Sequence, residues 1–287
     1  MPVLLGAVER FRAATHACRV LPDFLILGGQ KCGTTALHAY LLEHPCIAGG
    51  LRKEVQYFTL HYARGEAWYR AQFPTRWVSR RPARRCGRPL VVGDASPYYL
   101  FHPLAPLRAA RLLPTARLIV LLRDPVERAY SHYHHEVRKG RETLTFEEAI
   151  RREPERLAGQ ADQLRSGDLA VSAPHQRHSY LGRGLYVDQL HHWLAVFPRE
   201  QLLILDSAAL ERETAAVVGR VLDFLGVQDA PLQTTRRHGT GQYAPMAPET
   251  RAALRAHFAP YNRRLRDELL VDFGWDQPAA LDAAESR

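Results

Sequence analysis

A lysine, a glycine and two threonines stand together in residues 28–35, Gly-Gly-Gln-Lys-Cys-Gly-Thr-Thr. Free backbone N–H groups at a helix N-terminus attract anions, and Lys31 adds a full charge to them. Gly33 lets the backbone approach an anion closely, and Thr34 and Thr35 add hydroxyl donors. Loops of the GxxxxGK[ST] type place the lysine after the second glycine, whereas Lys31 precedes Gly33. The segment therefore predicts a P-loop-like anion site that does not suit nucleoside triphosphates; an ordinary glycine-rich turn is the alternative.

A second pair of polar residues, Arg123 and Ser131, follows the apolar run at residues 118–122. Asp124 and Pro125 are typical of the cap and the first position of a helix, so Ser131 is expected about two turns into that helix. Arginine can hold a phosphate with two parallel hydrogen bonds. The pair predicts a second anion contact. The alternative is a surface ion pair of Arg123 with Asp124, with Ser131 facing solvent.

Short apolar runs alternate with helical patterns, and these elements must position both pairs. The strand candidates are residues 24–29, 90–94, 118–122 and 202–206, and helical spacing is found at residues 34–41, 126–137, 217–225 and 254–269. This alternation predicts an α/β fold with a central, mostly parallel sheet and helices on both faces. Such sheets bind ligands at the carboxyl ends of their strands, which is where Lys31 and Arg123 stand.

Two stretches show no clear periodicity. Residues 76–88 contain six arginines and are predicted to form a solvated loop. Residues 151–178 are polar and irregular, which makes them a candidate mobile lid. The length of 287 residues suits one decorated α/β domain, so we expect residues 1–287 to form a single domain.

The formal net charge of +9 favours anionic ligands but does not distinguish nucleic acid, a lipid surface and a phosphorylated small molecule. No helix-turn-helix, zinc-finger or aromatic RNA-binding pattern is present, which argues against a nucleic-acid partner. Only three of the 39 basic side chains are lysines, and Lys31 and Lys53 both fall in segments with candidate chemistry. A lysine kept in an arginine-rich chain indicates a need for a compact ammonium group.

The four cysteines have neither the spacing of zinc ligands nor the density of a disulfide framework, so we predict thiols. No metal site is expected, because His132, His134 and His135 lack a Glu or Cys partner at suitable spacing. No apolar run approaches the roughly 20 residues that span a bilayer. No basic segment precedes the mostly apolar first eight residues. The sequence predicts a cytoplasmic protein without a membrane span.

Together these segments resemble the sulfotransferases that use 3′-phosphoadenosine 5′-phosphosulfate (PAPS). Residues 30–35 are similar to their 5′-phosphosulfate loop, and residues 123–131 to their 3′-phosphate motif. Residues 53–58, Lys-Glu-Val-Gln-Tyr-Phe, resemble the segment with the catalytic Glu in the heparan-sulfate-type branch. Residues 182–193 and 239–275 resemble the adenine-contacting segment and the closing pattern. The likeness follows the family's order over nearly the whole chain.

The resemblance implies a role for each matching residue. Contacts with the 5′-phosphosulfate are implied for Lys31, Cys32, Gly33, Thr34 and Thr35, and contacts with the 3′-phosphate are implied for Arg123 and Ser131. Tyr186 is implied to pack on adenine. The loop that closes over the nucleotide is implied to contain Gly239, Thr240 and Gly241. It also implies that Glu54 is the general base and that Lys31 acts at the leaving oxygen.

Two positions depart from the heparan-type pattern. Those enzymes carry Lys-Gly where this chain has Thr240-Gly241, and Arg236 or Arg237 is the candidate substitute. They also carry a lysine where this chain has Ala95 in its Asp-Ala-Ser-Pro segment. Both departures count against a heparan-like polysaccharide acceptor.

The implied reaction moves a sulfuryl group from PAPS to a hydroxyl or an amine of a carbohydrate or small-molecule natural product, leaving adenosine 3′,5′-bisphosphate. Like phosphoryl transfer, it depends on positioning and on stabilisation of charge. The sulfuryl group carries less charge than a phosphoryl group, so we expect no metal. A histidine among His132, His134 and His135 is the alternative base. The alternative functions are a P-loop-like small-molecule kinase and a basic nucleic-acid-binding module.

Overall fold

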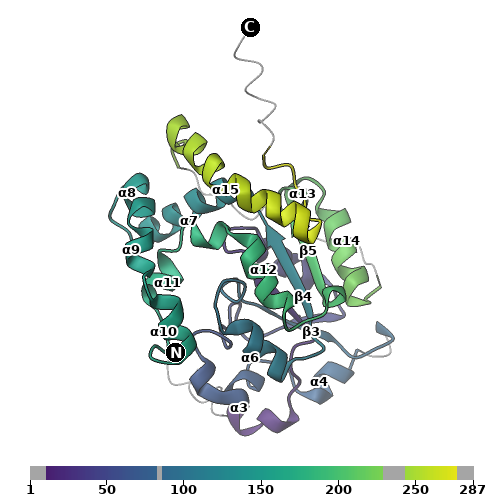
Figure 1. The fold of residues 1–287 in the computed structure, drawn as a ribbon. Coiled ribbons are helices and arrows are strands. Elements are labelled where there is room, and N and C mark those ends of the chain that lie inside the picture. The colour runs from purple at the N-terminus through teal and green to yellow at the C-terminus, as the bar shows by residue number, and fades with distance from the viewer. Residues whose placement is uncertain (1–10, 83–85, 229–242, 277–287) are drawn as a thin grey trace.

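The computed structural model describes residues 11–82, 86–228 and 243–276. Within these residues, five strands form one sheet in the order β2-β3-β1-β4-β5, and every neighbouring pair is parallel. The strands are β1 (Phe24–Gly28), β2 (Ile47–Gly49), β3 (Val91–Ala95), β4 (Arg117–Leu122) and β5 (Leu202–Asp206). The predicted α/β fold is confirmed, and the sheet is parallel throughout (Figure 1).

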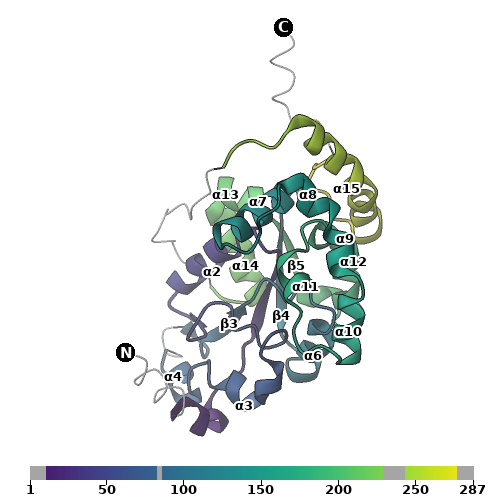
Figure 2. The same cartoon turned by 90° about the vertical axis from the view of Figure 1, so that its left-hand side faces the viewer.

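Helices cover both faces of the sheet, as Figure 2 shows. One face carries α6 (Ala105–Leu112), α12 (Tyr186–Leu194) and α15 (Pro248–Leu269), and the other carries α2 (Thr34–Glu43), α13 (Ser207–Arg212) and α14 (Thr214–Leu225). Leu25 and Leu27 of β1 belong to the first core, and Phe24 and Ile26 belong to the second. Successive side chains of a strand point to opposite faces, so a strand buried on both faces must be apolar throughout.

The remaining helices surround this three-layer core. They are α3 (Gly65–Arg70), α4 (Arg76–Arg80), α7 (Pro125–Arg138), α8 (Phe146–Arg151), α9 (Glu153–Leu157), α10 (Gln160–Ser166) and α11 (Ala173–Arg177), with 3₁₀ turns η1 (His16–Cys18), η2 (Tyr62–Arg64), η3 (Gly182–Gly184) and η4 (Arg199–Gln201). The predicted loop at residues 76–88 therefore begins with a helix. Thr75 caps it by accepting a hydrogen bond from the backbone N–H of Val78.

Residues 151–178, which have no periodicity in the sequence, form short helices. Gly159 lies between α9 and α10, and Gly167 follows α10; both take left-handed conformations, with φ of 69° and 87°. Ser172 caps α11 by accepting from the backbone N–H of His175. Helices of five to seven residues are too short to show a full amphipathic repeat, which is why the sequence did not reveal them. Their movement as a lid stays a prediction.

Cys46 and Cys86 form a disulfide with Cα atoms 5.7 Å apart, so the prediction of four thiols is wrong for this pair. Cys46 directly precedes β2, and Cys86 lies a few residues before β3, the parallel neighbour of β2. A separation of 40 residues hid this proximity from the sequence. Disulfides persist mainly in oxidising compartments. The pair therefore counts against the cytoplasmic location, which stays a prediction.

Gly93 of β3 lies opposite Phe24 of β1, and the Phe24 ring fills the space that a side chain at position 93 would need. A Cβ atom there would lie 2.1 Å from the ring. We expect Gly93→Ala to lower the free energy of unfolding by about 1–3 kcal/mol, the usual cost of overpacking. Equilibrium denaturation in urea measures this change.

Gly219→Ala is the matched control for this prediction. Gly219 lies within α14, and a Cβ atom there would meet nothing within 4 Å. Ala favours a helix over Gly by about 1 kcal/mol, so this variant should be at least as stable as the parent protein. Equal unfolding free energies for the two variants would mean that the Phe24 ring moves aside at little cost, contrary to our expectation.

Candidate active site

The loops that follow β1 and β4 meet at the carboxyl edge of the sheet. These strands are neighbours, and the chain leaves β1 toward β2 and β3 on one side but leaves β4 toward β5 on the other. In sheets of this topology, the reversal opens a crevice at the carboxyl ends of the two strands. Lys31 follows β1 and Arg123 follows β4. The strand order thus brings the two predicted anion contacts to one crevice.

A cavity of about 440 Å³ occupies this crevice, a size typical of small-molecule sites. Its wall consists of Gln30, Lys31, Gly33, Thr34, Thr35, Ala36, Glu54, Pro97, Arg123, Ser131, His135, Ser207, Glu211 and Tyr243. Both predicted phosphate contacts and the predicted base therefore share one cavity, although they come from three separate segments.

Left-handed backbone shapes the loop after β1. Lys31 has a φ of 71°, and Gly33, the N-cap of α2, has a φ of 85°. Because Gly33 has no side chain to cap the first N–H groups of α2, these groups are left for a ligand. A positive φ is uncommon for a residue other than glycine, so the surrounding structure must hold Lys31 in this conformation.

Cations cluster in and beside the cavity, whose wall also carries Glu54 and Glu211. Burial lowers the pKa of Lys31, and the nearby charges of Arg138 and Arg123 lower it further. Glu127 lies 4.0 Å from the Arg123 guanidinium, but it also pairs with Arg251 of α15. An anion bound between these cations would relieve their repulsion. This clustering of positive charge favours an anionic ligand.

Glu54 reaches the cavity from the segment between β2 and η2. Its Oε1 accepts a hydrogen bond from Lys53 Nζ at 3.0 Å, and its Oε2 accepts one from Gln56 Nε2 at 3.3 Å. Its side chain is 47% exposed, so an acceptor can reach it from solvent. Glu54 and Gln56 have φ of 61° and 55°. Strained backbone of this kind persists only where neighbouring contacts hold it, and it is common at functional sites.

A buried hydrogen-bond network holds the Glu54 segment. Asp94, at the end of β3, accepts from the hydroxyls of Tyr69 at 3.0 Å, Tyr99 at 2.8 Å and Ser96 at 2.8 Å. The hydroxyl of Ser96 accepts from the backbone N–H of Gln56 at 3.0 Å. Burial raises the pKa of Asp94, and the three hydroxyls oppose that rise. The network thus connects the sheet rigidly to the backbone that carries the predicted base.

Tyr186 and Cys32 lie beneath the cavity and not on its wall. They are 1% and 0% exposed. The Tyr186 hydroxyl donates to the backbone carbonyl of Arg123 at 2.8 Å and lies 3.9 Å from Cys32 Sγ. Tyr186 thereby positions the backbone of Arg123. The predicted contacts of these two residues with a nucleotide stay predictions.

The three neighbouring histidines of α7 have different surroundings. His132 is fully buried, with its ring 5.0 Å from that of Tyr180. His134 stacks on Tyr243 at 4.2 Å. His135 is the one of the three on the cavity wall. Burial, together with the nearby charge of Lys31, lowers its pKa to about 4, so it is neutral at neutral pH. His135 is therefore the rival to Glu54 as a base.

Some predicted residues lie outside the described ranges, and some wall residues were not predicted. The predicted residues outside the described ranges are Gly239, Thr240 and Gly241, with Arg236 and Arg237. The wall residues that were not predicted include Ser207, Glu211 and Tyr243. Ser207 directly follows β5, so the rule that located Lys31 and Arg123 was a usable signal for it. Glu211 and Tyr243 have no comparable local signal.

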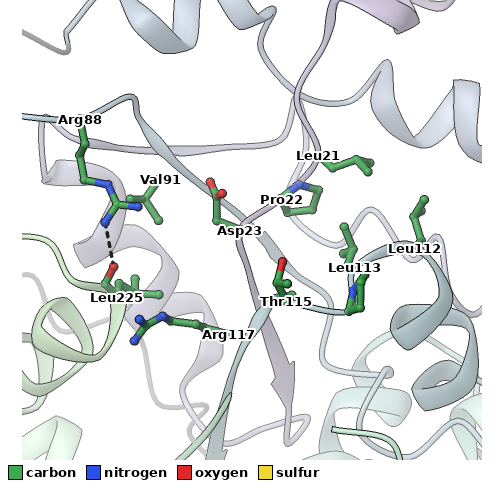
Figure 3. Close-up of a pocket in the computed structure, with 12 residues that line it drawn as sticks. Leu21, Pro22, Asp23, Arg88, Val91, Leu112, Leu113, Thr115, Arg117 and Leu225 are labelled. Carbon is green, nitrogen blue, oxygen red and sulfur yellow. Dashed lines mark hydrogen bonds between the residues drawn. The ribbon is translucent and has the colours of Figure 1, made fainter. Parts of the chain in front are cut away.

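A second cavity, of about 350 Å³, opens at the opposite, amino edge of the sheet (Figure 3). Its arginines are already engaged. Arg88 donates to the carbonyls of Leu225 at 3.3 Å and Gly226 at 3.1 Å, and Arg117 donates to that of Phe224. These carbonyls end α14, where such donors are needed. These two arginines thus serve the fold, which leaves the carboxyl edge as the candidate site.

Among the described residues, no group of three or more His, Cys, Asp or Glu side chains is placed to bind a metal ion. The same ranges contain no helix with the length and apolar character needed to cross a bilayer.

Known proteins resemble this chain in sequence and in fold. A family model described as "Sulfotransferase domain" matches residues 21–243. Human bifunctional heparan sulfate N-deacetylase/N-sulfotransferase 3 is 35% identical, over 73% of this chain and 23% of the human protein. The membrane-associated sulfotransferase kil1 of Dictyostelium discoideum is 28% identical, over 89% of this chain and 66% of that protein. The crystal structure of a sulfotransferase from Alicyclobacillus acidocaldarius has a TM-score of 0.69 and 30% identity, covering 90% of this chain and 100% of that one. This chain thus corresponds to only part of the two curated relatives.

Proposed function

Because this chain belongs to the sulfotransferase domain family of enzymes, we propose that it transfers the sulfuryl group of PAPS to a hydroxyl or an amine of an acceptor. The observation that carries the proposal is the meeting of Lys31 and Arg123 in one cavity, with the charge of Arg138 nearby. PAPS bears a phosphosulfate at its 5′ position and a phosphate at its 3′ position. A ligand of this class needs two separate anion contacts, and the residues present fit that need.

Each anion contact has its own set of residues. Lys31, Thr34, Thr35 and the first N–H groups of α2 are proposed to hold the 5′-phosphosulfate. Arg123 and Ser131 are proposed to hold the 3′-phosphate. Ser131 is only 7% exposed, so its hydroxyl is available to the cavity more than to bulk solvent.

When bound, PAPS supplies an electrophilic sulfuryl group on a phosphate leaving group. Lys31 and the N–H groups of α2 stabilise the negative charge that develops on the leaving oxygen. Glu54 accepts the proton of the acceptor, and Lys53 and Gln56 orient its carboxylate. Positioning and electrostatics of this kind supply most of the rate enhancement in related transfers.

The acceptor is proposed to be a carbohydrate or a small-molecule natural product, and nucleic acid is not expected as a partner. The exposed side chain of Glu54 supports approach of an acceptor from solvent. The human relative is named for heparan sulfate. Ala95 occupies the position where heparan-type enzymes carry a lysine, which favours a different acceptor. Residues 1–287 are proposed to form a single sulfotransferase domain.

Arg123→Ala is expected to weaken binding of the product, adenosine 3′,5′-bisphosphate, by roughly 10- to 100-fold. The reason is that loss of a charge-assisted hydrogen bond costs about 1.5–3 kcal/mol. Adenosine 5′-phosphosulfate has no 3′-phosphate, so it should bind the parent protein weakly and respond little to the substitution. Isothermal titration calorimetry measures both affinities.

Arg111→Ala is the matched control, because it removes the same charge from an exposed residue of α6 that is not on the cavity wall. We expect it to leave the affinity for the bisphosphate nearly unchanged. Equal affinities of the parent protein for the two nucleotides would argue against the 3′-phosphate site. Competition by ATP or by DNA, as effective as that by the bisphosphate, would favour the kinase or the nucleic-acid-binding function.

A further inference from the structure

Arg183 is a buried cation that the proposed chemistry does not use. It lies in η3 and is 4% exposed. Its Nη1 donates to the side-chain Oε1 of Gln30, and its Nη2 donates to the backbone carbonyl of Gln176 at 2.6 Å. A buried charge is costly unless hydrogen bonds compensate it. These two contacts therefore indicate what Arg183 does: it connects the last turn of α11 to the loop after β1.

Aromatic rings fix the guanidinium group of Arg183. Its carbon lies 4.7 Å from the ring centre of Tyr98 and 5.2 Å from that of Phe101. His175 stacks on Phe101 at 4.4 Å, and its Nδ1 lies 2.8 Å from the Tyr98 hydroxyl, with which it shares a hydrogen bond. Cation–π contacts are strongest where water is excluded, as it is here. The rings thus restrict the orientation in which Arg183 can meet Gln30.

The backbone beside Arg183 is fixed as well. Glu153 of α9 accepts from the backbone N–H groups of Leu181 at 2.6 Å and Gly182 at 2.7 Å. Gly184 packs against Phe258 of α15 so closely that a Cβ atom would lie 2.6 Å from the ring. Contacts with helices outside the cavity wall therefore fix the position of Arg183. Its guanidinium donates a hydrogen bond to Gln30, the residue before Lys31.

We propose that Arg183 is a positioning residue that holds Gln30 and thereby keeps Lys31 in its left-handed conformation in the cavity. This inference rests on the function proposed above. Gln30 is on the cavity wall and directly precedes Lys31, whose φ of 71° is unfavourable for a residue with a side chain. Without the anchor, the loop relaxes and the ammonium group moves. A displacement of about 1 Å can reduce a reaction rate by roughly 100-fold.

Gln30→Ala, Arg183→Met and the double variant form a thermodynamic cycle. The readout is transfer of labelled sulfate from PAPS to the best acceptor in a panel of monosaccharides, amino sugars and phenols. Each single variant is expected to lower kcat by roughly 10- to 100-fold. The double variant should lose no more than the more impaired single variant, because both substitutions remove the same interaction. Losses that multiply in the double variant would overturn the proposal.

Two further arginine variants separate positioning from folding. Arg183→Lys keeps the charge with a single ammonium group, so it should recover part of the lost kcat. Arg128 is another fully buried arginine, and it donates to the carbonyl of Tyr180 and not to the loop. The effect of Arg128→Met on kcat should therefore multiply with that of Gln30→Ala. If Arg183→Met does not fold, Gln30→Ala and Arg183→Lys decide the question, and normal kcat in both would overturn the proposal.

Hydrogen exchange at the backbone amides of residues 29–33 gives a readout that does not require transfer. In the ligand-free protein, faster exchange in Gln30→Ala would support the contact of Arg183 with Gln30 as an anchor. The same holds for Arg183→Met, if it folds, and a smaller increase is expected for Arg183→Lys. Unchanged exchange in the folded variants would overturn it, even with reduced activity. Failure of the parent protein to bind adenosine 3′,5′-bisphosphate would instead contradict the proposed function, and the exchange experiment would still test the anchor.

Discussion

Glu54→Gln is expected to lower kcat by about 10²- to 10⁴-fold, the usual contribution of general base catalysis. Glutamine keeps the shape of the side chain but removes its basicity, so the substitution separates proton transfer from packing. The two proposed phosphate contacts lie on other segments, so the affinity for adenosine 3′,5′-bisphosphate should be nearly unchanged. Kinetics with labelled PAPS and a panel of hydroxyl and amine acceptors measure kcat, and calorimetry measures the affinity.

The size of this effect depends on how firmly the carboxylate of Glu54 is held. Lys53 and Gln56 each bond to one of its oxygens, and Asp94 holds the backbone beneath through Ser96. Preorganised groups of this kind lose no free energy to reorientation during the reaction. A freely rotating surface glutamate would show a much smaller effect.

His135 is the competing base, and the pH profile alone does not identify it. An ordinary histidine would place an acidic limb near pH ~6.5. Burial and the charge of Lys31 lower the pKa of His135 to about 4, so this imidazole is able to accept a proton throughout the neutral range. The variants must decide. We expect His135→Gln to keep most of the activity. The reverse pattern, an active Glu54→Gln and an inactive His135→Gln, would assign the base to His135 and leave PAPS-dependent transfer itself intact.

Lys31→Ala is expected to lower kcat by about 10²- to 10³-fold, the size typical for loss of one preorganised group that stabilises transition-state charge. Its ammonium is proposed to act on the leaving oxygen, where negative charge develops during the reaction. The loss in kcat should therefore exceed the loss in affinity for the bisphosphate product. Partial burial keeps solvent from screening this charge, and the same burial lowers the pKa of Lys31.

Lys139→Ala is the matched control for Lys31→Ala. Lys139 is an exposed lysine at the end of α7 and is not on the cavity wall, so its removal should change kcat little. Lys31→Arg adds a second comparison, because it keeps the charge but replaces a compact ammonium with a planar group. Normal kcat with only a raised KM for PAPS in Lys31→Ala would assign Lys31 to uniform binding of the donor.

Local patterns in the sequence were sufficient to place Lys31 and Arg123 at the carboxyl edge of the sheet. β1 and β4 are central strands buried on both faces, so their sequences are apolar throughout and stand out from the chain. Lys31 and Arg123 follow these strands directly. Parallel strands all end at the same edge of a sheet, so a position just after a strand predicts a shared site even before the strand order is known.

Elements without a strong local signature escaped sequence reasoning. β2 has only three residues and lies at the edge of the sheet, too short for an alternating pattern to appear. The Cys46–Cys86 disulfide depends on the pairing of β2 with β3, so it was missed as well. The helices of residues 151–178 were also missed, because they too are short.

Only the tertiary structure decided which side chains support the site. His135 reaches the cavity and His132 does not, because their rotation around α7 is set by the packing of that helix. Arg183 meets Gln30 across 153 residues of sequence. Caps, turns and hydrophobic periodicity are determined by neighbours within a few residues, and a sequence displays them directly. Hydrogen bonds between distant segments arise only when the whole chain packs, and no local pattern reports them.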